Sequence, residues 1–314
     1  MKLVSLIVPI YNEEDNIKIL LKNISKNLNI KGYKFEIIIV DDGSTDNSYQ
    51  ILNTERKIFK NIKILKLMRN FGQTAALAAG TDCSKGEIII TMDGDNQNDP
   101  SDIKNLLKKI ENNYDLVSGW RKNRKDNFLS RILLSKIANY LISKISGVKL
   151  NDYGCTLKAY NARLLKNIVM YGEMHRFIPI YIKWLGGKIT EIPVNHYPRK
   201  YGKTKYGLSR VYKVFSDIIL ILLIDKYFTK PMHLFGGFSI INFIFGIIFF
   251  ILMIYIKYSS INLAFHKTPL PSLVVLFILI SILSLLLGFI AEILIRSFYS
   301  SKKENKPYII SENK

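Results

Sequence analysis

The chain has 314 residues, of which 48% are hydrophobic and 22% charged, and its formal net charge at pH 7 is +20. This length allows one sizeable catalytic domain with additional segments. The only two cysteines, Cys83 and Cys155, exclude a disulfide framework and a cysteine-based metal site, so we expect both to be reduced. The positive charge predicts an anionic partner, which is a nucleic acid, an anionic membrane surface or an anionic substrate.

Strands and helices alternate along residues 1–100. Short apolar runs predict strands at 3–10, 35–40, 62–66 and 87–92, and apolar spacing predicts helices at 13–28 and 74–79. This alternation predicts an α/β fold with a mostly parallel sheet and helices on both of its faces. Ligands of such sheets bind at the carboxyl ends of the strands, and each polar motif of this region directly follows a predicted strand.

The fourth predicted strand is followed by the acidic sequence Asp93-Gly94-Asp95-Asn96-Gln97. Two carboxylates and an amide oxygen at the end of a strand suit a hard divalent cation that carries substrate phosphates. The motif therefore predicts phosphate chemistry assisted by Mg²⁺ or Mn²⁺. An Asp-rich turn is the alternative for an isolated motif of this kind.

Two other phosphate-binding folds are excluded by missing glycines. Pro9-Ile10-Tyr11-Asn12-Glu13 follows the first strand where a dinucleotide-binding enzyme has Gly-x-Gly-x-x-Gly. Gly202-Lys203-Thr204 imitates the end of a P-loop, but Tyr197 occupies the required upstream glycine position. We therefore expect neither a dinucleotide enzyme nor a P-loop NTPase.

Three polar residues, Arg131, Ser135 and Asn139, recur at i, i+4 and i+8 on a segment rich in leucine and isoleucine. This spacing predicts an amphipathic helix that lies on a membrane surface and offers its polar stripe to a lipid phosphate. A solvated helix face is the alternative. Arg121, which follows a predicted strand, is a further candidate phosphate ligand.

Basic residues also gather in a glycine-containing stretch, at Arg199, Lys200, Lys203, Lys205 and Arg210. Cations in such a stretch could neutralise a diphosphate and an acceptor phosphate as the reaction begins. The alternative is general attraction to anionic headgroups, worth about 1 kcal/mol per basic residue.

Two apolar stretches, Leu234–Ile256 and Leu270–Ile295, each exceed the roughly 20 residues that span a bilayer. A buried hairpin of core helices is the alternative. Basic residues flank both stretches, and the positive-inside rule places such flanks in the cytoplasm. We therefore expect the catalytic domain and both termini to be cytoplasmic. The flanking residues are Lys226, Lys230, Arg296, Lys302 and Lys303. Lys257 and Lys267 in the connecting loop weaken this orientation. We predict a catalytic domain at 1–212, an interfacial helix at 213–232, a membrane hairpin at 233–300 and a tail at 301–314.

Five motifs stand in order along the chain: Val8-Pro9-Ile10-Tyr11-Asn12-Glu13-Glu14, Asp41-Asp42-Gly43-Ser44-Thr45-Asp46, Arg69-Asn70-Phe71-Gly72, Asp93-Gly94-Asp95-Asn96-Gln97-Asn98-Asp99-Pro100 and Gly202-Lys203-Thr204-Lys205-Tyr206. Together they resemble the family 2 glycosyltransferases that attach a sugar to polyprenyl phosphates. This group includes dolichol-phosphate mannosyltransferases and bactoprenol glucosyltransferases. The two predicted spans place the likeness nearer to the bactoprenol type.

This resemblance implies a GT-A nucleotide-binding domain that uses a sugar nucleotide and Mg²⁺ or Mn²⁺, and it implies a homo-oligomer. The implied nucleotide-sugar ligands are Pro9, Tyr11, Glu13, Asp41 and Asp93. We add two candidates to this set: Asp42, which is adjacent to Asp41, and Arg121, which follows a predicted strand. The implied metal ligands are Asp93, Asp95 and Gln97. The implied catalytic residues, which include the contacts to the acceptor phosphate, are Asp95, Arg131, Ser135, Arg199 and Lys203. Roles for Asp152, Glu173, His175 and Arg176, in segments that also resemble the family, stay open.

The hypothesis that follows is the inverting transfer of a hexose from a nucleotide sugar to polyprenyl phosphate. UDP-glucose is the first donor to consider, and GDP-mannose, UDP-galactose and UDP-N-acetylglucosamine stay open. A phosphate monoester is largely dianionic at neutral pH, since its second pKa is about 6, so no strong general base is required. A polysaccharide synthase is a second hypothesis, although the chain has no Gln-x-x-Arg-Trp motif. A membrane-tethered binding protein without catalysis is a third. The absence of a recognised nucleic-acid module argues against nucleic-acid binding.

Overall fold

The computed structural model describes residues 1–59, 61–122, 139–140, 142–144, 146–170, 172–198, 230–258 and 268–301, with the backbone alone at 296 and 298–301. The chain forms two compact units, Met1–Ile218 and Ile219–Lys314. Each unit is considered by itself below.

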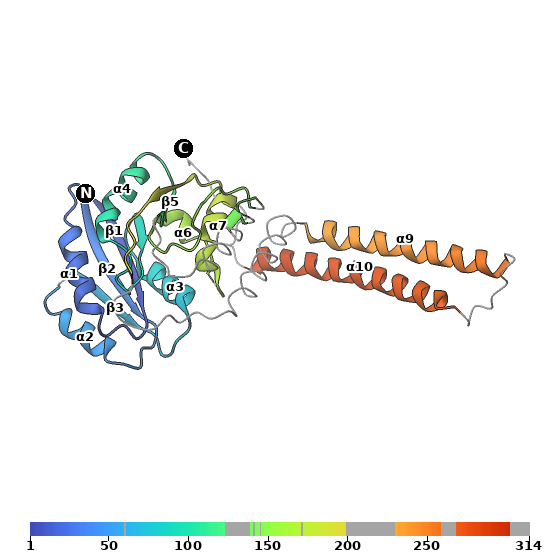
Figure 1. The fold of residues 1–314 in the computed structure, drawn as a ribbon, viewed down its shortest axis with the longest axis horizontal. Helices are drawn as coiled ribbons and strands as arrows, with labels where there is room; N and C mark the ends of the chain where they lie inside the picture. The colour runs from blue at the N-terminus through green and yellow to red at the C-terminus, as the bar shows by residue number, and fades with distance from the viewer. Residues whose placement is uncertain are drawn as a thin grey trace. The chain divides into compact units, whose positions relative to one another are not determined.

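The first unit is built on one sheet of seven strands in the order β3-β2-β1-β4-β6-β5-β7 (Figure 1). The strands are β1 (Lys2–Ile10), β2 (Tyr33–Asp41), β3 (Ile62–Lys66), β4 (Ile88–Thr91), β5 (Leu116–Trp120), β6 (Lys158–Asn161) and β7 (Ile189–Pro193). The helices are α1 (Ile17–Asn27), α2 (Ser48–Glu55), α3 (Gln73–Cys83), η1 (Pro100–Asp102), α4 (Ile103–Glu111), α6 (Ala162–Leu165), η2 (Met174–Arg176) and α7 (Ile178–Trp184).

The sheet is mostly parallel, as the sequence predicts, with one reversal. β1 pairs parallel with β2 and β4, β2 with β3, and β5 with β7, whereas β6 runs antiparallel to both β4 and β5. The registers pair Ile10 with Asp41 and Ile7 with Thr91. The carboxyl ends of β1, β2 and β4 therefore meet at one edge of the sheet.

Helices cover both faces of the sheet because β1 and its neighbours are apolar on both sides. Val4, Leu6 and Val8 share a buried cluster with the apolar faces of α1 and α4. On the opposite face α3 packs close to the sheet, since a Cβ on Gly80 would lie 2.5 Å from Ile7 Cγ2. Burying a large aliphatic side chain contributes about 1.5–3 kcal/mol, so these two layers fix the strand ends firmly.

Two predicted helix boundaries differ in the structure. The helix predicted to begin at residue 13 begins at Ile17, because residues 13–16 form a turn in which the Glu13 carbonyl accepts from the N–H of Asn16 (2.9 Å). The helix predicted at 74–79 extends over Gln73–Cys83. Small residues continue to that end, so the helix can stay close to the strands.

The second unit contains two long helices, α9 (Pro231–Tyr258) and α10 (Leu270–Ser301), which form an antiparallel pair. Ser239 Oγ lies 3.0 Å from Ser281 Oγ, and the rings of Phe249 and Phe277 stack with centroids 5.3 Å apart. An 18-residue window of α9 has a mean hydropathy of 2.6, and only 17% of it is buried within the chain. The corresponding window of α10 has a mean hydropathy of 3.1 and is 22% buried. Their length and exposed apolar surface agree with the predicted spans and indicate a membrane anchor.

Candidate active site

Side-chain hydrogen bonds join the loops that follow β1 and β2. The N–H of Asn12 donates to Ser44 Oγ (3.0 Å), and Asn12 Oδ1 accepts from the N–H of Thr45 (2.8 Å). Asn12 has φ = 52°, in the left-handed region that asparagine tolerates better than most residues. Tyr11 and Glu13, two of the predicted nucleotide-binding residues, lie in the first loop, and Pro9 and Asp41 lie at the ends of the strands that lead into the two loops.

Asp41, the last residue of β2, is fully buried and keeps one oxygen for a ligand. Its Oδ1 accepts from the N–H of Ser44 (3.0 Å). Within the described part of the chain, Oδ2 is the one buried side-chain oxygen or nitrogen without a hydrogen-bond partner. An unsatisfied buried polar group costs about 1–3 kcal/mol, and more when it is charged. A ligand that donates a hydrogen bond to Oδ2, such as a ribose hydroxyl or a base N–H, would remove this cost.

The neighbouring Asp42 makes a different set of contacts. Its Oδ1 accepts from the N–H of Phe71 (2.8 Å) and its Oδ2 from the N–H of Gly72 (2.9 Å). Gly43 permits this approach, because its φ is 67° and a Cβ there would lie 2.4 Å from the Arg69 carbonyl carbon. Asp42 therefore anchors the β3–α3 loop, and its predicted contact with the nucleotide stays a prediction.

The acidic motif lies directly against the end of β1. A Cβ on Gly94 would lie 2.6 Å from Ile10 Cγ2 and 3.1 Å from the Pro9 carbonyl oxygen. The spacer between the two carboxylates of Asp93 and Asp95 therefore has to be glycine. The structure thus brings the predicted metal motif beside the predicted nucleotide loop.

Both oxygens of Asp93 accept hydrogen bonds from distant segments. Oδ1 accepts from Gln73 Nε2 (2.9 Å), and Oδ2 accepts from Thr156 Oγ1 (2.6 Å). Burial raises the pKa of Asp93, while the Thr156 hydroxyl and the charges of Arg121 and Lys158 oppose that shift. A cation at this carboxylate would likewise favour its ionised form.

The rest of the acidic loop is bonded to the segment that precedes the basic stretch. Asn98 and His196 form an antiparallel bridge, and the N–H of Tyr197 donates to the Gln97 carbonyl (2.9 Å). The Gln97 amide donates in turn to the Tyr197 carbonyl through Nε2 (3.3 Å). The predicted catalytic residues Arg199 and Lys203 follow this segment in sequence and lie outside the described residues, as do Arg131 and Ser135.

Arg121, the further candidate phosphate ligand, is paired with a carboxylate. Its Nε lies 2.7 Å from Asp152 Oδ2 and its Nη2 lies 3.0 Å from Asp152 Oδ1. Such a two-point pair fixes the guanidinium plane. Arg121 is therefore held at the end of β5, and its contact with a phosphate stays a prediction.

Gln73, Thr156 and Lys158 are site residues that our reading of the sequence did not identify. Thr156 and Lys158 belong to the antiparallel return through β6, whose four residues give no recognisable strand pattern. Gln73 directly follows the Arg69–Gly72 motif, and this position is the one sequence signal that could have identified it as a site residue. Cys155 directly precedes Thr156, and burial raises the pKa of its thiol to about 11, which disfavours the nucleophilic thiolate at neutral pH.

The donor set suits a cation held jointly with a substrate. No group of three or more His, Cys, Asp or Glu residues that could hold a metal occurs among the described residues. Mg²⁺ is usually bound through one or two carboxylates plus substrate phosphates and water. Asp93 and Asp95 fit that arrangement, with a diphosphate supplying the further oxygens.

A mostly parallel sheet with helices on both faces and an acidic motif at its central carboxyl edge define a GT-A-like glycosyltransferase fold. The chain belongs to glycosyl transferase family 2, whose family model matches residues 5–169. The protein is therefore a glycosyltransferase of this family.

Two relatives are similar over most of their length. A dodecaprenyl-phosphate galacturonate synthase of Rhizobium johnstonii is 38% identical over 303 residues, which cover 94% of this chain and 88% of the relative. An undecaprenyl-phosphate 4-deoxy-4-formamido-L-arabinose transferase of Edwardsiella ictaluri is 34% identical over 259 residues, covering 82% of this chain and 78% of the relative. The family predicted from the motifs is confirmed.

The fold also resembles that of solved glycosyltransferases. A glucosyl-3-phosphoglycerate synthase of Mycobacterium tuberculosis, determined with Mn²⁺, UDP-glucose and phosphoglyceric acid, aligns with a TM-score of 0.55 at 17% identity. The alignment covers 71% of this chain and 79% of that one. At this identity the likeness supports the GT-A-like fold alone.

Proposed function

We propose that the protein transfers a sugar from a nucleotide sugar to the phosphate of a membrane polyprenyl phosphate. The observation that carries this proposal is that the unsatisfied Asp41 Oδ2 at the end of β2 and the Asp93 and Asp95 carboxylates after β4 lie at the same edge of the sheet, on either side of β1. One group suits a nucleoside donor and the others suit a diphosphate-bound cation. The names of both relatives support the polyprenyl phosphate as acceptor.

The nucleotide is bound at the loops after β1 and β2. Asp41 Oδ2 accepts a hydrogen bond from the ribose or base, and the Tyr11 ring covers the base. Glu13 lies in the same loop, where its Oε2 accepts from Asn16 Nδ2 (2.7 Å). The bonds between the two loops hold these groups in place before the substrate arrives, which lowers the entropic cost of binding.

Asp93, Asp95 and Gln97 hold Mg²⁺ or Mn²⁺ in this proposal. The cation neutralises the diphosphate when bound, and thereby makes it a better leaving group. Thr156 and Gln73 orient the Asp93 carboxylate toward this task. The Mn²⁺ in the solved M. tuberculosis enzyme makes Mn²⁺ the first ion to try.

The acceptor phosphate attacks C1 of the sugar from the face opposite the nucleotide. The bond from C1 to the diphosphate oxygen breaks, the bond from C1 to the acceptor oxygen forms, and the configuration inverts. Arg131, Ser135, Arg199 and Lys203 bind the acceptor phosphate, which is already a dianion and needs no base. Holding the two anions together is then the main contribution of the protein.

The α9–α10 pair keeps the catalytic unit at the membrane where the lipid acceptor resides. Basic residues around the predicted spans favour a cytoplasmic catalytic unit attracted to the anionic membrane surface, and the resemblance favours a homo-oligomer. UDP-glucose, the donor expected from the sequence, is one of several possible donors. Neither relative named above is a glucosyltransferase, so the donor has to be measured.

The test is radiolabel transfer by the full chain in detergent, with undecaprenyl phosphate, Mn²⁺ and a panel of UDP- and GDP-linked sugars and uronic acids. We expect one donor to give an acid-labile product that partitions into organic solvent. Asp95→Asn should abolish transfer while the exposed control Asp82→Asn keeps it. Full activity of the Asp95 variant would contradict the metal site, and a water-soluble polymer would favour a polysaccharide synthase.

A further inference from the structure

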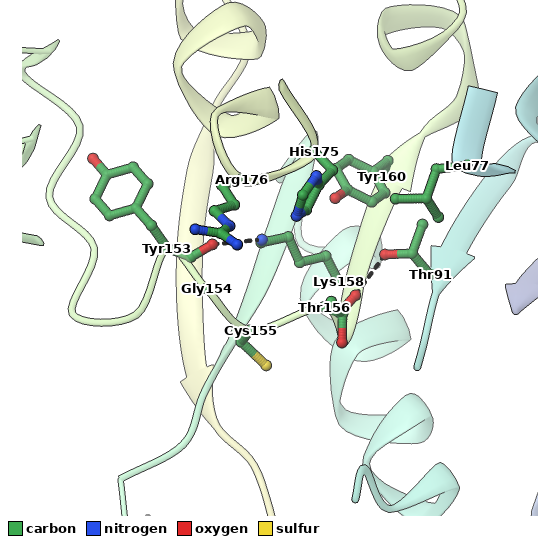
Figure 2. A pocket seen from close by; sticks show the side chains of 10 residues that line it. All are labelled: Leu77, Thr91, Tyr153, Gly154, Cys155, Thr156, Lys158, Tyr160, His175 and Arg176. Carbon is green, nitrogen blue, oxygen red and sulfur yellow. Dashed lines mark hydrogen bonds between the residues drawn. The ribbon is translucent and has the colours of Figure 1, made fainter. Parts of the chain in front are cut away.

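A small pocket beside Asp93 is lined by three basic side chains, Lys158, His175 and Arg176, which we call the basic pocket. Figure 2 shows the side chains of Lys158, His175 and Arg176 gathered around the pocket that they line. Thr156 also lines the pocket, and its hydroxyl donates to Asp93 Oδ2 (2.6 Å). One side chain therefore separates the basic pocket from the acidic motif.

Lys158 is 2% exposed and only partly satisfied by the protein. Within the described residues its Nζ donates one hydrogen bond, to the Tyr153 carbonyl (3.1 Å). An ammonium has three donors, so two remain for another acceptor. Burial lowers the pKa of Lys158 to about 8, which still leaves the amine mostly charged at neutral pH. A buried cation in this state calls for an anion or a strong acceptor.

The other two basic side chains are held by neighbouring residues. Arg176 Nη2 lies 3.9 Å from Glu173 Oε2, which is longer than a hydrogen bond. The Glu173 side chain is 48% exposed, so water screens this contact strongly. His175 Nδ1 lies 2.8 Å from Thr74 Oγ1, and this contact fixes the direction of the ring.

The nearby acids are engaged elsewhere. Burial lowers the pKa of Lys158 and the charges of Asp152 and Asp93 oppose that shift, but Asp152 also forms the two-point pair with Arg121, and Asp93 belongs to the metal in the proposed function. A divalent cation held by the acidic motif would neutralise Asp93, which would then balance less of the Lys158 charge. The basic pocket then carries positive charge that a substrate anion can match.

We propose that the basic pocket binds a carboxylate of the donor sugar, so that the donor is a nucleotide-linked uronic acid. This inference rests on the proposed function, in which the acidic motif holds the diphosphate that carries the sugar. The sugar ring must lie next to that diphosphate, and among the described residues the basic pocket is a neighbouring site whose cations have donors left for an anion. A neutral hexose would leave the buried Lys158 donors without a charged partner.

The test compares UDP-galacturonate with UDP-galactose, which differ only in a carboxylate or a hydroxymethyl group at C5. The full chain is assayed with undecaprenyl phosphate and Mn²⁺, and kcat/KM is measured for each donor. We expect the uronate to be preferred by about tenfold or more, the factor expected for hydrogen bonds to a charged group. UDP-glucuronate and UDP-glucose serve as a second matched pair.

Two variants locate the preference. Arg176→Gln and Lys158→Met should each lower the ratio of uronate to neutral donor by about tenfold. Lys183→Met, an exposed charge removal on α7, should leave the ratio unchanged. Thermal unfolding and UDP binding show whether each variant is folded. If Lys158→Met does not fold, the donor preference of Arg176→Gln decides the test.

The outcomes separate this inference from the proposed function. Preference for the neutral donor, with a lipid-linked product, overturns the uronic acid and keeps the proposed function. No transfer from any donor overturns both. The two variants could instead lose kcat/KM equally with both donors and show a higher KM for polyprenyl phosphate. That result would assign the basic pocket to the acceptor phosphate, and so overturn the donor assignment.

Discussion

Asp41 and Asp42 are adjacent, yet the same substitution should affect them in opposite ways. In Asp41→Asn the remaining oxygen keeps its bond to the Ser44 N–H, and the new amide replaces an oxygen that has no protein partner. In Asp42→Asn one of two backbone N–H groups loses its acceptor and meets an N–H₂ donor. The first variant should lose ligand binding and the second should lose stability.

The magnitudes follow from the bonds involved. A hydrogen bond to a charged acceptor contributes about 1.5–3 kcal/mol, so Asp41→Asn should weaken UDP binding by about 10- to 100-fold. Asp42→Asn loses one such bond and leaves a donor poorly satisfied, at a cost of about 2–4 kcal/mol. For a unit of this size that cost lowers Tm by roughly 5–15 °C.

The assays are UDP titration calorimetry with Mn²⁺ and thermal unfolding of the full chain in detergent. We expect Asp41→Asn to melt within roughly 2 °C of the parent, because no protein bond is lost. The reasoning is refuted if Asp41→Asn keeps full UDP affinity, or if Asp42→Asn melts as the parent does. The matched chemistry of the two variants makes each the control of the other.

Three further predictions concern other parts of the chain. Gly43→Ala should destabilise the first unit by about 2 kcal/mol or more, because its Cβ would meet the Arg69 backbone at 2.4 Å; an unchanged denaturation midpoint would contradict this. The lowered pKa of Lys158 means that the unfolded chain binds more protons between about pH 8 and the ordinary lysine pKa. The free energy of unfolding should therefore rise with pH there relative to Lys158→Met, and parallel pH profiles of the two proteins would argue against it. Gly288→Leu should separate α9 from α10, because even a Cβ would lie 2.9 Å from Met232 Sδ; cross-linking of Ser239→Cys with Ser281→Cys should fall, and undiminished cross-linking would show that the helices repack.

The sequence predicts the part of the site that lies at the ends of long parallel strands. β1, β2 and β4 are apolar runs that stop directly before polar motifs, so Asp41, Asp93 and Asp95 could be placed at one edge. The direction of each side chain could not be predicted. Asp41 and Asp42 have the same chemistry, and only the position of the β3–α3 loop decides which of them keeps an oxygen for a ligand.

The remaining part of the site depends on pairing between distant segments. Thr156 reaches Asp93 across 63 residues, and Asp152 reaches Arg121 across 31. Neither pairing leaves a local pattern, because β6 is four residues long and runs against its neighbours. Lys158 is likewise unremarkable in a chain with 45 lysines and arginines until the fold buries it.

The reversal of β6 also divides the enzyme into separately adjustable parts. The groups proposed for the nucleotide and the metal come from β1, β2 and β4, whereas the residues around the proposed sugar contact come from 152–176. The two parts are joined at two points, because Thr156 bonds to Asp93 and Asp152 bonds to Arg121. An exchange of 152–176 between relatives could therefore alter the sugar contact and still hold the diphosphate only if these two side chains were kept. Two hydrogen-bonded junctions would then mark where a transplanted sugar-binding segment has to match its new host.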